Sequence, residues 1–365
     1  MSGDAMTTYH NLYTTQNESQ WRAALPASRS VFGSIEFARL NEKYRGVTAR
    51  LLALGNASEL IAYPFVVRPL DGLPFSHPSA LWDSATPEYS GPLGIRSDTA
   101  GHFSVTTHHL FKELGVIAEF MHLHPWEIEA RLLRDGESSL NRDVVWVDLS
   151  RSDDDLWCNS FTPTCRNKIR RSQAENVRVL EASGLADIHE FVRIYHQTMD
   201  RNQALESYYF TEEYFAAIFE SMPASARFVL AEHRGTVVAA ALYLHDRDTA
   251  YSYLTGTDYA HQQVRPTNAI IYETIKWARS KGKKRLLLGA GYRQDDGVFK
   301  FKASFSNLRA PFHVYRRIHL ADQYQQLEEK WCLHYSSTAE HATYFPSYRS
   351  VAPMKMEDES VCDAN

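Results

Sequence analysis

The sequence predicts an α/β (α+β) fold in two domains, and three observations support this prediction. The chain has 365 residues, which is more than one ordinary hydrophobic core accommodates and indicates about two domains. Segments with helical and strand-like patterns alternate along both halves, as is typical of α/β domains. In the second half, three strand-like segments have very short connections, which predicts an antiparallel meander. We therefore expect domains at residues 1–150 and 151–350 and a disordered tail at 351–365.

The composition is that of an ordinary globular protein, with 44% hydrophobic and 23% charged residues. The net charge of -5 argues against binding nucleic acid along the whole surface, so we expect no DNA partner, whereas a local basic patch stays compatible. No apolar run approaches about 18 residues, and residues 1–20 lack a signal-peptide pattern. The 4 cysteines are scattered, which favours reduced thiols. We expect a cytoplasmic monomer without a membrane span.

The first half predicts short helices, a hairpin and then alternating elements. Helices are expected at residues 19–25, 34–44, 104–114 and 127–133, and strands at residues 47–54, 59–69, 116–123 and 144–149. The first two strands are joined by a Gly55-Asn56 turn and should form the hairpin. Pro64 and Pro69 predict that its second strand is an edge strand or has irregular ends. Residues 70–101, rich in proline, glycine, serine and aspartate, are expected to form a long loop.

Four histidines raise the question of a metal site. His122 and His124 share a face if their strand is regular, and His108 and His109 precede them. Metal ligation competes here with ordinary hydrogen bonding. The sequence favours hydrogen bonding, because no carboxylate or cysteine lies at a convincing ligand spacing. We therefore expect no metal.

The second half repeats the α/β pattern more clearly. Helices are expected at residues 164–177, 186–202, 211–221 and 269–281, and strands at residues 226–233, 237–246 and 249–257, from residue 286 and at residues 312–318. Ile188, Phe191 and Tyr195 lie on one side of the second of these helices. Thr211 is expected to cap the third.

A cationic segment begins the helix expected at residues 164–177. Its basic residues are Arg166, Lys168, Arg170 and Arg171. Cations are unfavourable near a helix N-terminus because the partial positive charge of the helix dipole at that end repels them. This favours an anionic partner, since arginine binds phosphate and carboxylate through paired hydrogen bonds. The alternative is a solvated face that pairs with the aspartates at residues 153–155.

The residues from 286 to 305 have the clearest chemical character. A buried strand runs into two glycines, and Asp296 is expected to make a turn and cap a following helix. Lys300 and Lys302 then lie among phenylalanines. A cation in such surroundings can stabilise a developing negative charge, because partial desolvation strengthens its field. A surface helix with solvated lysines is the equally weighted alternative.

Six segments carry a family resemblance, and they are residues 63–68, 89–92, 166–177, 194–195, 266–268 and 296–305. Together they resemble the Fem family of aminoacyl-tRNA-dependent peptidyltransferases and its GNAT-like relatives, over about residues 31–318. The order of helices, meander, helix and final strands also resembles the GNAT acyltransferase fold. The resemblance implies two tandem GNAT-like domains with an interdomain cleft, each domain having a mixed, mostly antiparallel sheet flanked by helices.

The resemblance also implies an acyltransferase that forms an amide bond. An aminoacyl group would pass from aminoacyl-tRNA, the co-substrate, to an amine of a peptide, a peptidoglycan-precursor-like molecule or a natural product. The partners would be the acceptor end of a charged tRNA and a small peptide or amine, with no separate cofactor. The sequence departs from the family at two places. It lacks the coiled-coil arm of some members, and it has no clear equivalent of the acidic position near the Gly-Pro loop, since Asp98 is several residues away.

The donor stays open between aminoacyl-tRNA and an acyl-CoA. Ordinary GNAT enzymes hold the CoA pyrophosphate on a glycine-rich loop at a helix N-terminus. Residues 261–268 contain no glycine, and Pro266 lacks an N–H. This weakens the acyl-CoA alternative, in which Arg265 and the helix N-terminus would bind phosphate. A tRNA donor would use the cationic segments at residues 166–171 and 279–285. A non-catalytic binding protein of GNAT architecture is the third alternative.

The expected mechanism is direct aminolysis of the donor ester. The resemblance assigns to Phe301 and Lys302 the Phe-Lys pair that supports catalysis in Fem ligases. Lys302 would stabilise the oxyanion and Phe301 would exclude water. Asp296 or Tyr292 would orient the amine or relay its proton. The candidate substrate-binding residues are Tyr89, Gly91, Arg170, Arg171, Tyr195, Tyr253, Arg265, Asn268, Tyr292 and Lys300.

Overall fold

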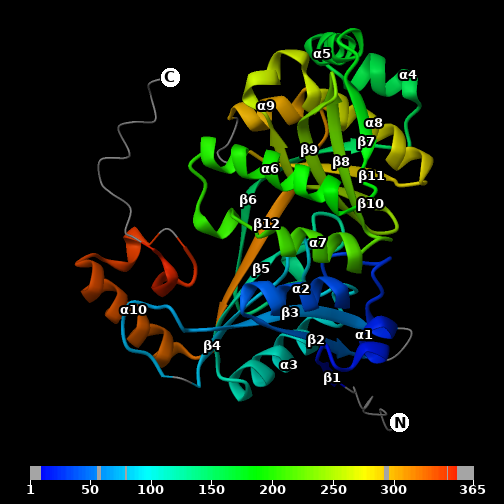
Figure 1. Ribbon diagram of the computed structural model, residues 1–365. Coiled ribbons are helices and arrows are strands. Elements are labelled where there is room, and N and C mark those ends of the chain that lie inside the picture. The colour runs from blue at the N-terminus through cyan, green and yellow to red at the C-terminus, as the bar shows by residue number, and fades with distance from the viewer. Residues whose placement is uncertain (1–9, 56–58, 79, 292–295, 343, 352–365) are drawn as a thin grey trace, which may run out of the picture. The chain divides into compact units, whose positions relative to one another are not determined.

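The structure is a computed structural model that describes residues 10–55, 59–78, 80–291, 296–342 and 344–351. The chain divides into two compact units, whose elements are labelled in Figure 1. Unit 1 comprises Met1–Ala24, Asn41–Asn141 and Phe312–Asn365, and unit 2 comprises Leu25–Leu40 and Arg142–Pro311. These boundaries differ from the predicted division after residue 150, because segments distant in sequence share a unit. Apart from Val351, the predicted tail lies outside the described residues.

Unit 1 contains a mixed, mostly antiparallel sheet. Its strand order is β1-β2-β3-β4-β5-β12, and β4 and β5 pair in parallel. The strands are β1 (His10–Tyr13), β2 (Thr48–Leu54), β3 (Ile61–Pro69), β4 (Trp82–Ala85), β5 (Val116–His122) and β12 (Arg309–Ile318). From Val314 to Ile318, β12 pairs with β5 in antiparallel orientation. This pairing brings the last part of the chain into unit 1, so the second domain predicted at residues 151–350 is too long.

The helices that belong to unit 1 pack around this sheet. They are α1 (Glu18–Ala24), α3 (Ala100–Glu113) and α10 (Ala321–Tyr335), and α2 (Ile35–Arg45) lies partly in this unit. Both α3 and α10 contact β5. Leu327 and the fully buried Trp331 of α10 pack against Ile117 and Ala118 of β5. The sequence predicts α1, α2 and α3, whereas α10 is absent from that prediction.

Of the two alternatives predicted from Pro64 and Pro69, the edge strand is wrong, because β3 pairs with β2 on one side and β4 on the other. The Ala62 N–H donates to Leu93 O at 2.9 Å. The nitrogen of Pro64, two residues further on, therefore faces the same side of β3. Pairing with β4 begins at Val66. Pro64 thus lies between the contact of Ala62 with Leu93 and the pairing of Val66 with β4. At this position no partner strand needs the N–H that proline lacks.

Two further predictions in unit 1 need correction. The expected loop at residues 70–101 contains β4 and the first residues of α3. The expected helix at residues 127–133 contains only a short 3₁₀ turn, η1 (Ala130–Leu132). Here His124 Nδ1 accepts hydrogen bonds from the N–H groups of Trp126 and Glu127 at 3.3 and 3.1 Å. A side chain that binds these N–H groups competes with helix formation.

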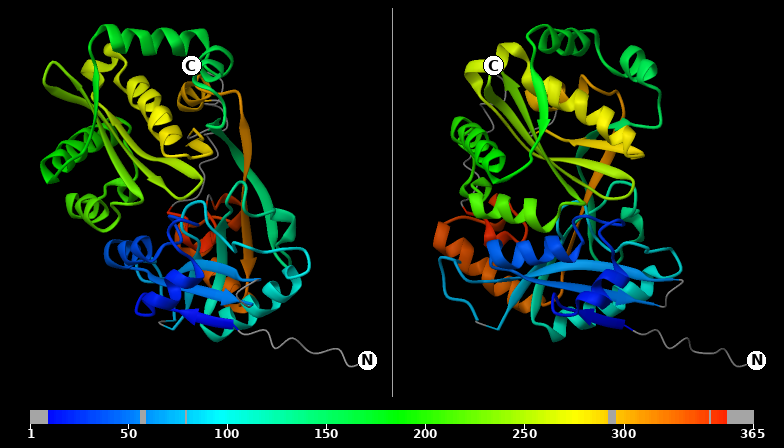
Figure 2. Two further views of the ribbon diagram at one scale, coloured as in Figure 1. Left: turned by 90° about the vertical axis from the view of Figure 1, so that its right-hand side faces the viewer. Right: turned by 45° about the vertical axis from the view of Figure 1, so that its right-hand side comes forward.

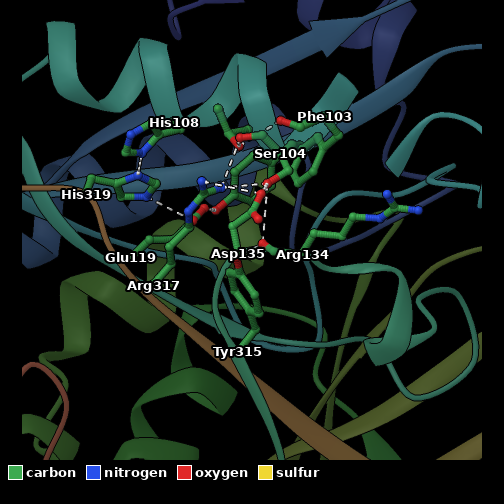
Figure 3. Close-up of polar contacts among 11 residues, drawn as sticks. Phe103, Ser104, His108, Glu119, Arg134, Asp135, Tyr315, Arg317 and His319 are labelled. Atoms are coloured by element: carbon green, nitrogen blue, oxygen red, sulfur yellow. Dashed lines mark hydrogen bonds and ion pairs between the residues drawn. The ribbon is translucent and has the colours of Figure 1, made fainter. Parts of the chain in front are cut away.

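A buried polar network joins α3 to the sheet of unit 1 (Figure 3). Glu119 of β5 is 1% exposed, and its carboxylate accepts a hydrogen bond from Tyr63 Oη at 2.5 Å. The same carboxylate lies 3.2 Å from Nε2 of His319, which directly follows β12. His319 Nδ1 in turn lies 3.0 Å from Nδ1 of His108 on α3. The buried polar groups are therefore partnered, as an apolar interior requires.

Unit 2 contains the predicted antiparallel meander. Its strand order is β6-β11-β10-β9-β8-β7. The strands are β6 (Glu137–Asp148), β7 (Arg178–Glu181), β8 (Ala226–His233), β9 (Thr236–His245), β10 (Thr249–Thr257) and β11 (Arg285–Gly289). Of β6, the part from Arg142 to Asp148 belongs to this unit. Neighbours from β7 to β10 are antiparallel, whereas β10 and β11 are parallel. The strands predicted from residue 226 to residue 286 are thereby confirmed, and β7 is an addition to them.

Helices cover both faces of this meander, with α6 and α8 on opposite sides (Figure 2). The helical elements are α4 (Asp153–Asp155), η2 (Leu156–Ser160), α5 (Pro163–Ala174), α6 (Leu185–Arg201), η3 (Glu206–Tyr208), α7 (Glu212–Ser221), η4 (Tyr259–Val264), α8 (Pro266–Ser280) and α9 (Gly297–Ala303). Ile270 and Ile275 of α8 join Ile169 of α5 in the core. The predicted cap at Thr211 is confirmed, since its hydroxyl accepts the Tyr214 N–H at 3.3 Å. Among the described helices, none has both the length and the apolar character to cross a membrane.

Candidate functional site

The described residues of unit 2 form a pocket of about 430 Å³ at the N-terminus of α8. Its walls come from the first turn of α8, the end of β10 and η4, together with side chains of α5, α6 and α9. Ligand pockets for small molecules commonly measure roughly 300–1,000 Å³. The pocket is therefore large enough to hold part of a substrate.

The pocket lies beyond the point where the pairing of two parallel strands ends. β10 pairs with β11 from Thr249 to Tyr251 but continues to Thr257. The chain then turns through η4 and reaches α8 at Arg265, whose φ of 59° lies in the left-handed region. Pro266 occupies the first helical position, where a missing N–H removes no intrahelical bond. The partial positive charge of this helix end therefore lies at the carboxyl end of β10.

Three basic side chains from different elements line the pocket, namely Lys168 of α5, Arg201 of α6 and Arg265. Arg201 Nη1 donates to Thr257 O at 3.1 Å, which fixes the position of its guanidinium. In the described part of the chain, Lys168 and Arg265 form no ion pair with an acidic residue. Uncompensated cations beside a helix N-terminus give a positive potential that favours anions such as phosphate.

Asn268 adds a buried amide to the first turn of α8. It lines the pocket and is 3% exposed. Its Nδ2 atom has no hydrogen-bond partner among the described residues. A buried donor without an acceptor is costly, so an oxygen of a bound ligand would be stabilised by this group. The pocket thus combines charged and neutral donors around one helix end.

The short helix α9 contributes Gly297, Val298 and Phe301 to the pocket. Asp296 caps this helix, because its Oδ1 accepts the Phe299 N–H at 2.7 Å. This contact confirms the predicted cap, whereas Asp295 of the predicted turn lies outside the described residues. The cap fixes the start of α9, and Val298 and Phe301 supply apolar surface to the pocket.

Lys302 lies next to Phe301 on α9 and is not part of the pocket lining. Its Nζ donates a hydrogen bond to Ala290 O at 2.6 Å, directly after β11. Burial lowers the pKa of Lys302 to about 8, and the carboxylate of Asp296 opposes this shift. The amine is therefore mostly protonated at neutral pH. An ammonium group has three N–H donors, and among the described residues Ala290 O accepts one of them.

The structure brings three of the predicted site residues to the pocket, namely Arg265, Asn268 and Phe301. Asp296 and Lys302 adjoin it through α9. Lys300 lies on the same helix but is exposed and outside the lining. Tyr292 lies outside the described residues.

Two predicted tyrosines lie elsewhere in unit 2. Tyr195 is 1% exposed, and its hydroxyl donates to Tyr208 O at 2.7 Å. The Tyr253 ring lies 6.0 Å from the ring of Phe32, and its hydroxyl oxygen lies 3.4 Å from that of Tyr214. Neither residue lines the pocket, so their role in substrate binding stays a prediction.

The cationic segment of α5 reaches the pocket through Lys168, whereas the predicted Arg170 and Arg171 lie outside the lining. The guanidinium of Arg170 lies over the Trp157 ring, 5.2 Å from its centroid. Arg171 lies 3.7 Å from the carboxylate of Glu175 on the same helix. An anionic partner at these two arginines stays a prediction, while their neighbour Lys168 is the residue of the segment that lines the pocket.

Tyr89 and Gly91 lie in unit 1. Tyr89 has a φ of 42°, and its ring centroid lies 5.2 Å from that of Phe312. Gly91 is buried with a φ of 121°, and a Cβ there would lie 2.7 Å from Ile128 Cδ1. The positive φ of Gly91 suits glycine, and a role of either residue in substrate binding stays a prediction.

The histidines considered as metal ligands have other contacts. His122 stacks on Phe312 with ring centroids 5.7 Å apart, and His124 accepts the two backbone N–H groups described above. In the part of the chain that the structure describes, no group of three or more His, Cys, Asp or Glu side chains is arranged to hold a metal ion.

Sequence reasoning missed Arg201 and Tyr259 as pocket residues. Arg201 is the last residue of α6, and Tyr259 is the first residue of η4. Only their arrangement in space connects them with α8. Lys168 could have been found, because it belongs to the cationic segment that the sequence already singled out.

Comparison with known proteins identifies the type of domain that holds the pocket. Residues 159–302 match the family model described as an acetyltransferase (GNAT) domain. No curated protein matches the chain. Among solved structures, FemX is similar with a TM-score of 0.67 and 13% identity, over 87% of this chain and 99% of FemX.

Two other solved structures have a similar fold over most of this chain. A conserved protein of unknown function from Bacteroides thetaiotaomicron VPI-5482 has a TM-score of 0.51 and 13% identity, over 83% of this chain and 97% of that chain. The C-terminal domain (DUF2156) of a protein described as a lysylphosphatidylglycerol synthetase from Agrobacterium fabrum has a TM-score of 0.50 and 10% identity, over 87% of this chain and 96% of that chain. Identities this low establish the fold, and the domain match supports acyltransferase activity. The predicted resemblance is therefore confirmed at the level of the fold: the chain has a Fem-like GNAT fold, with its match to the acetyltransferase domain at residues 159–302.

Proposed function

We propose that the protein is an aminoacyltransferase that forms an amide bond between an aminoacyl group, delivered by aminoacyl-tRNA, and an amine of a small peptide or natural-product-like acceptor. The observation that carries this proposal is the pocket at the N-terminus of α8, inside the segment that matches a GNAT domain. Its three cations suit a donor that carries phosphates.

The details of the helix start support a donor other than the usual CoA. Pro266 removes one backbone N–H from the first turn, and the turn before it contains no glycine that would let a pyrophosphate approach the backbone closely. Side chains supply the positive charge in its place, through Lys168, Arg201 and Arg265. Side chains of this kind can follow a polynucleotide backbone, which agrees with a tRNA donor.

The chemistry we propose is direct aminolysis. The acceptor nitrogen attacks the carbonyl carbon of the aminoacyl ester, a C–N bond forms, and the ester C–O bond breaks. The ribose oxygen leaves with a proton, and the nitrogen loses one. No enzyme nucleophile is needed, because the donor is already activated.

Lys302 is the residue we assign to the transition state. Its ammonium would stabilise the negative oxygen of the tetrahedral intermediate through N–H groups other than the one that Ala290 O accepts. Phe301 would exclude water from the donor. Asp296 keeps α9 in place by capping it, and its carboxylate favours the charged form of Lys302.

An acyl-CoA donor is the second candidate, and the match to an acetyltransferase domain favours it. The same pocket would then bind the CoA pyrophosphate, and a thioester C–S bond would break in place of the ester bond. The acceptor amine and the role of Lys302 would be unchanged.

A transfer assay with both donors tests the proposal. Radiolabelled aminoacyl-tRNAs and labelled acetyl-CoA are supplied separately to amine-containing fractions, using wild type, Lys302→Ala and Lys276→Ala. Lys276 is a matched control, because it pairs with Glu273 on α8 at 3.0 Å. We expect RNase-sensitive transfer from aminoacyl-tRNA that falls by about 10²–10³ in Lys302→Ala and is unchanged in Lys276→Ala. Transfer from acetyl-CoA alone would establish the second candidate, and no transfer from either donor would contradict both.

A further inference from the structure

We propose that Tyr259, held by Arg201, is a stacking platform for an adenine base, so that the pocket accepts an adenosine phosphate as the end of the donor. This inference rests on the proposed function, because it assigns a second part of the same donor. It names the chemistry shared by the two candidates. The terminal adenosine of tRNA and the adenosine bisphosphate part of CoA both combine adenine with phosphate.

The position of Tyr259 is unusual for an aromatic side chain. Tyr259 is 62% exposed, although aromatic rings usually bury most of their surface. It also lines the pocket, next to the cations. Its ring is therefore accessible to a ligand that already has its phosphates at α8.

Arg201 prepares this ring for a planar ligand. The guanidinium carbon of Arg201 lies 5.5 Å from the centroid of the Tyr259 ring. The hydrogen bond from Arg201 Nη1 to Thr257 O at 3.1 Å restricts its side chain. The cation supports one side of the ring and leaves most of the residue accessible. An arginine held in this way also reduces the conformational entropy lost when a ligand binds.

The groups of the pocket divide naturally between phosphate and base. Lys168, Arg265 and the first turn of α8 provide charge and N–H donors, which suit phosphate oxygens. Tyr259 provides a flat aromatic surface, which suits a base of any sequence because every base has a π-face. Cationic grooves with aromatic platforms are the usual means of binding single-stranded nucleic acid ends. This arrangement explains why an exposed tyrosine lies beside three cations.

Binding of two probes separates the base from the phosphate. Adenosine 3′,5′-bisphosphate contains both groups, and pyrophosphate contains no base. We expect Tyr259→Ala to weaken the affinity for the bisphosphate about tenfold and to leave the affinity for pyrophosphate unchanged. Tyr259→Phe should retain the wild-type affinity for both, because it keeps the ring. Tyr208→Ala, at an exposed tyrosine of η3 that is not part of the pocket lining, is the control and should bind as wild type does.

Three results would overturn the platform. They are equal affinities for the bisphosphate in wild type and Tyr259→Ala, an equal loss for both probes, and a loss in Tyr259→Phe as large as in Tyr259→Ala. Because Tyr259 and Tyr208 are both exposed, we expect all three variants to melt at the wild-type temperature. The binding comparison is therefore made between folded proteins.

Competition and transfer assays distinguish the source of the adenosine and separate this inference from the proposed function. An RNA minihelix ending in CCA should displace the bisphosphate if tRNA is the donor, and CoA should displace it if acyl-CoA is. If neither donor supports transfer but Tyr259-dependent binding is seen, the platform stands and the proposed function fails. If transfer proceeds and Tyr259→Ala leaves the KM for the donor unchanged, the function stands and the platform fails.

Discussion

Lys302 shows how the surroundings of one residue can prepare it for chemistry. The side chain of an exposed lysine is fully protonated at neutral pH, with an ordinary pKa of about 10.4. Burial lowers the pKa of Lys302 to about 8, while the nearby carboxylate of Asp296 limits the change. The group therefore keeps its charge under physiological conditions and loses it in mildly alkaline solution. Such a shift makes a catalytic role measurable.

The pH dependence of transfer should report this titration. A group whose pKa is lowered loses its proton as the pH rises through the lowered value, here about 8. If the ammonium stabilises the oxyanion, the ratio of kcat/KM in wild type to that in Lys302→Ala should fall about tenfold between pH 7 and pH 9. The ratio cancels the titration of the acceptor amine, which affects both proteins. A ratio that stays constant over this range would contradict the role assigned to Lys302.

At the residue scale, the sequence predicts those parts of the site that lie in one continuous segment. The order Arg265, Pro266 and Asn268 before a helical pattern already places these residues at a helix start, and the structure has them in the pocket. The structure also places Arg201 and Tyr259 there, from separate elements, and no spacing rule connects them with α8. Tyr195 fits a helical apolar pattern equally well as a core residue, which is what it is.

At the scale of elements, polar side chains connect α3 to the sheet of unit 1 along two paths, and the first runs through Glu119 (Figure 3). Glu119 accepts from Tyr63 and approaches His319, which reaches α3 through His108. On a second path, Arg317 Nη1 donates to Ser104 O of α3 at 2.9 Å. Both paths start on neighbouring strands, since Arg317 and Glu119 are paired in the register of β12 and β5.

Removal of the Glu119 carboxylate should therefore destabilise the protein strongly. In Glu119→Ala the Tyr63 hydroxyl and the His319 ring lose a buried partner, and we expect the free energy of unfolding to fall by about 3–5 kcal/mol. Glu113→Ala is the matched control at an exposed position of α3, with an expected change within about 0.5 kcal/mol. Urea denaturation of the two variants and the wild type measures both changes. Similar values for the two variants would show that the network does not hold α3 in place.

The elements that the sequence predicts well are long and strongly patterned. The meander from β8 to β10 and the helices α6, α7 and α8 are confirmed within a few residues. The additional strands β1, β4 and β7 each have 4 residues, which is too short for a period-two pattern to stand out. The helix expected at residues 127–133 does not form as predicted, because the His124 side chain accepts hydrogen bonds from the backbone N–H groups at its start. A pattern of apolar residues does not reveal such competition between a side chain and the helix.

At the scale of the whole molecule, the two units are built from interleaved segments of the chain. Unit 2 includes residues 142–148 of β6, of which residues 145–148 pair with β11, while unit 1 includes the part of β12 that pairs with β5. A division after residue 150 would separate β11 from β6, one of its two partner strands. Sequence analysis predicts two domains from length, but long-range strand pairing decides which segments belong to each.

The central claim is that a phosphate-bearing acyl donor binds in the pocket at α8 and that its acyl group is transferred to an amine. The most direct test is the KM for the donor in a variant that combines Lys168→Ala and Arg265→Ala, compared with wild type and Arg178→Ala. Arg178 is a control cation on β7, 3.4 Å from Glu232 and outside the pocket lining. We predict that the double variant raises the KM at least about tenfold, because hydrogen bonds to charged groups contribute roughly 1.5–3 kcal/mol each, and that Arg178→Ala leaves it unchanged. A folded double variant with the wild-type KM would contradict the claim.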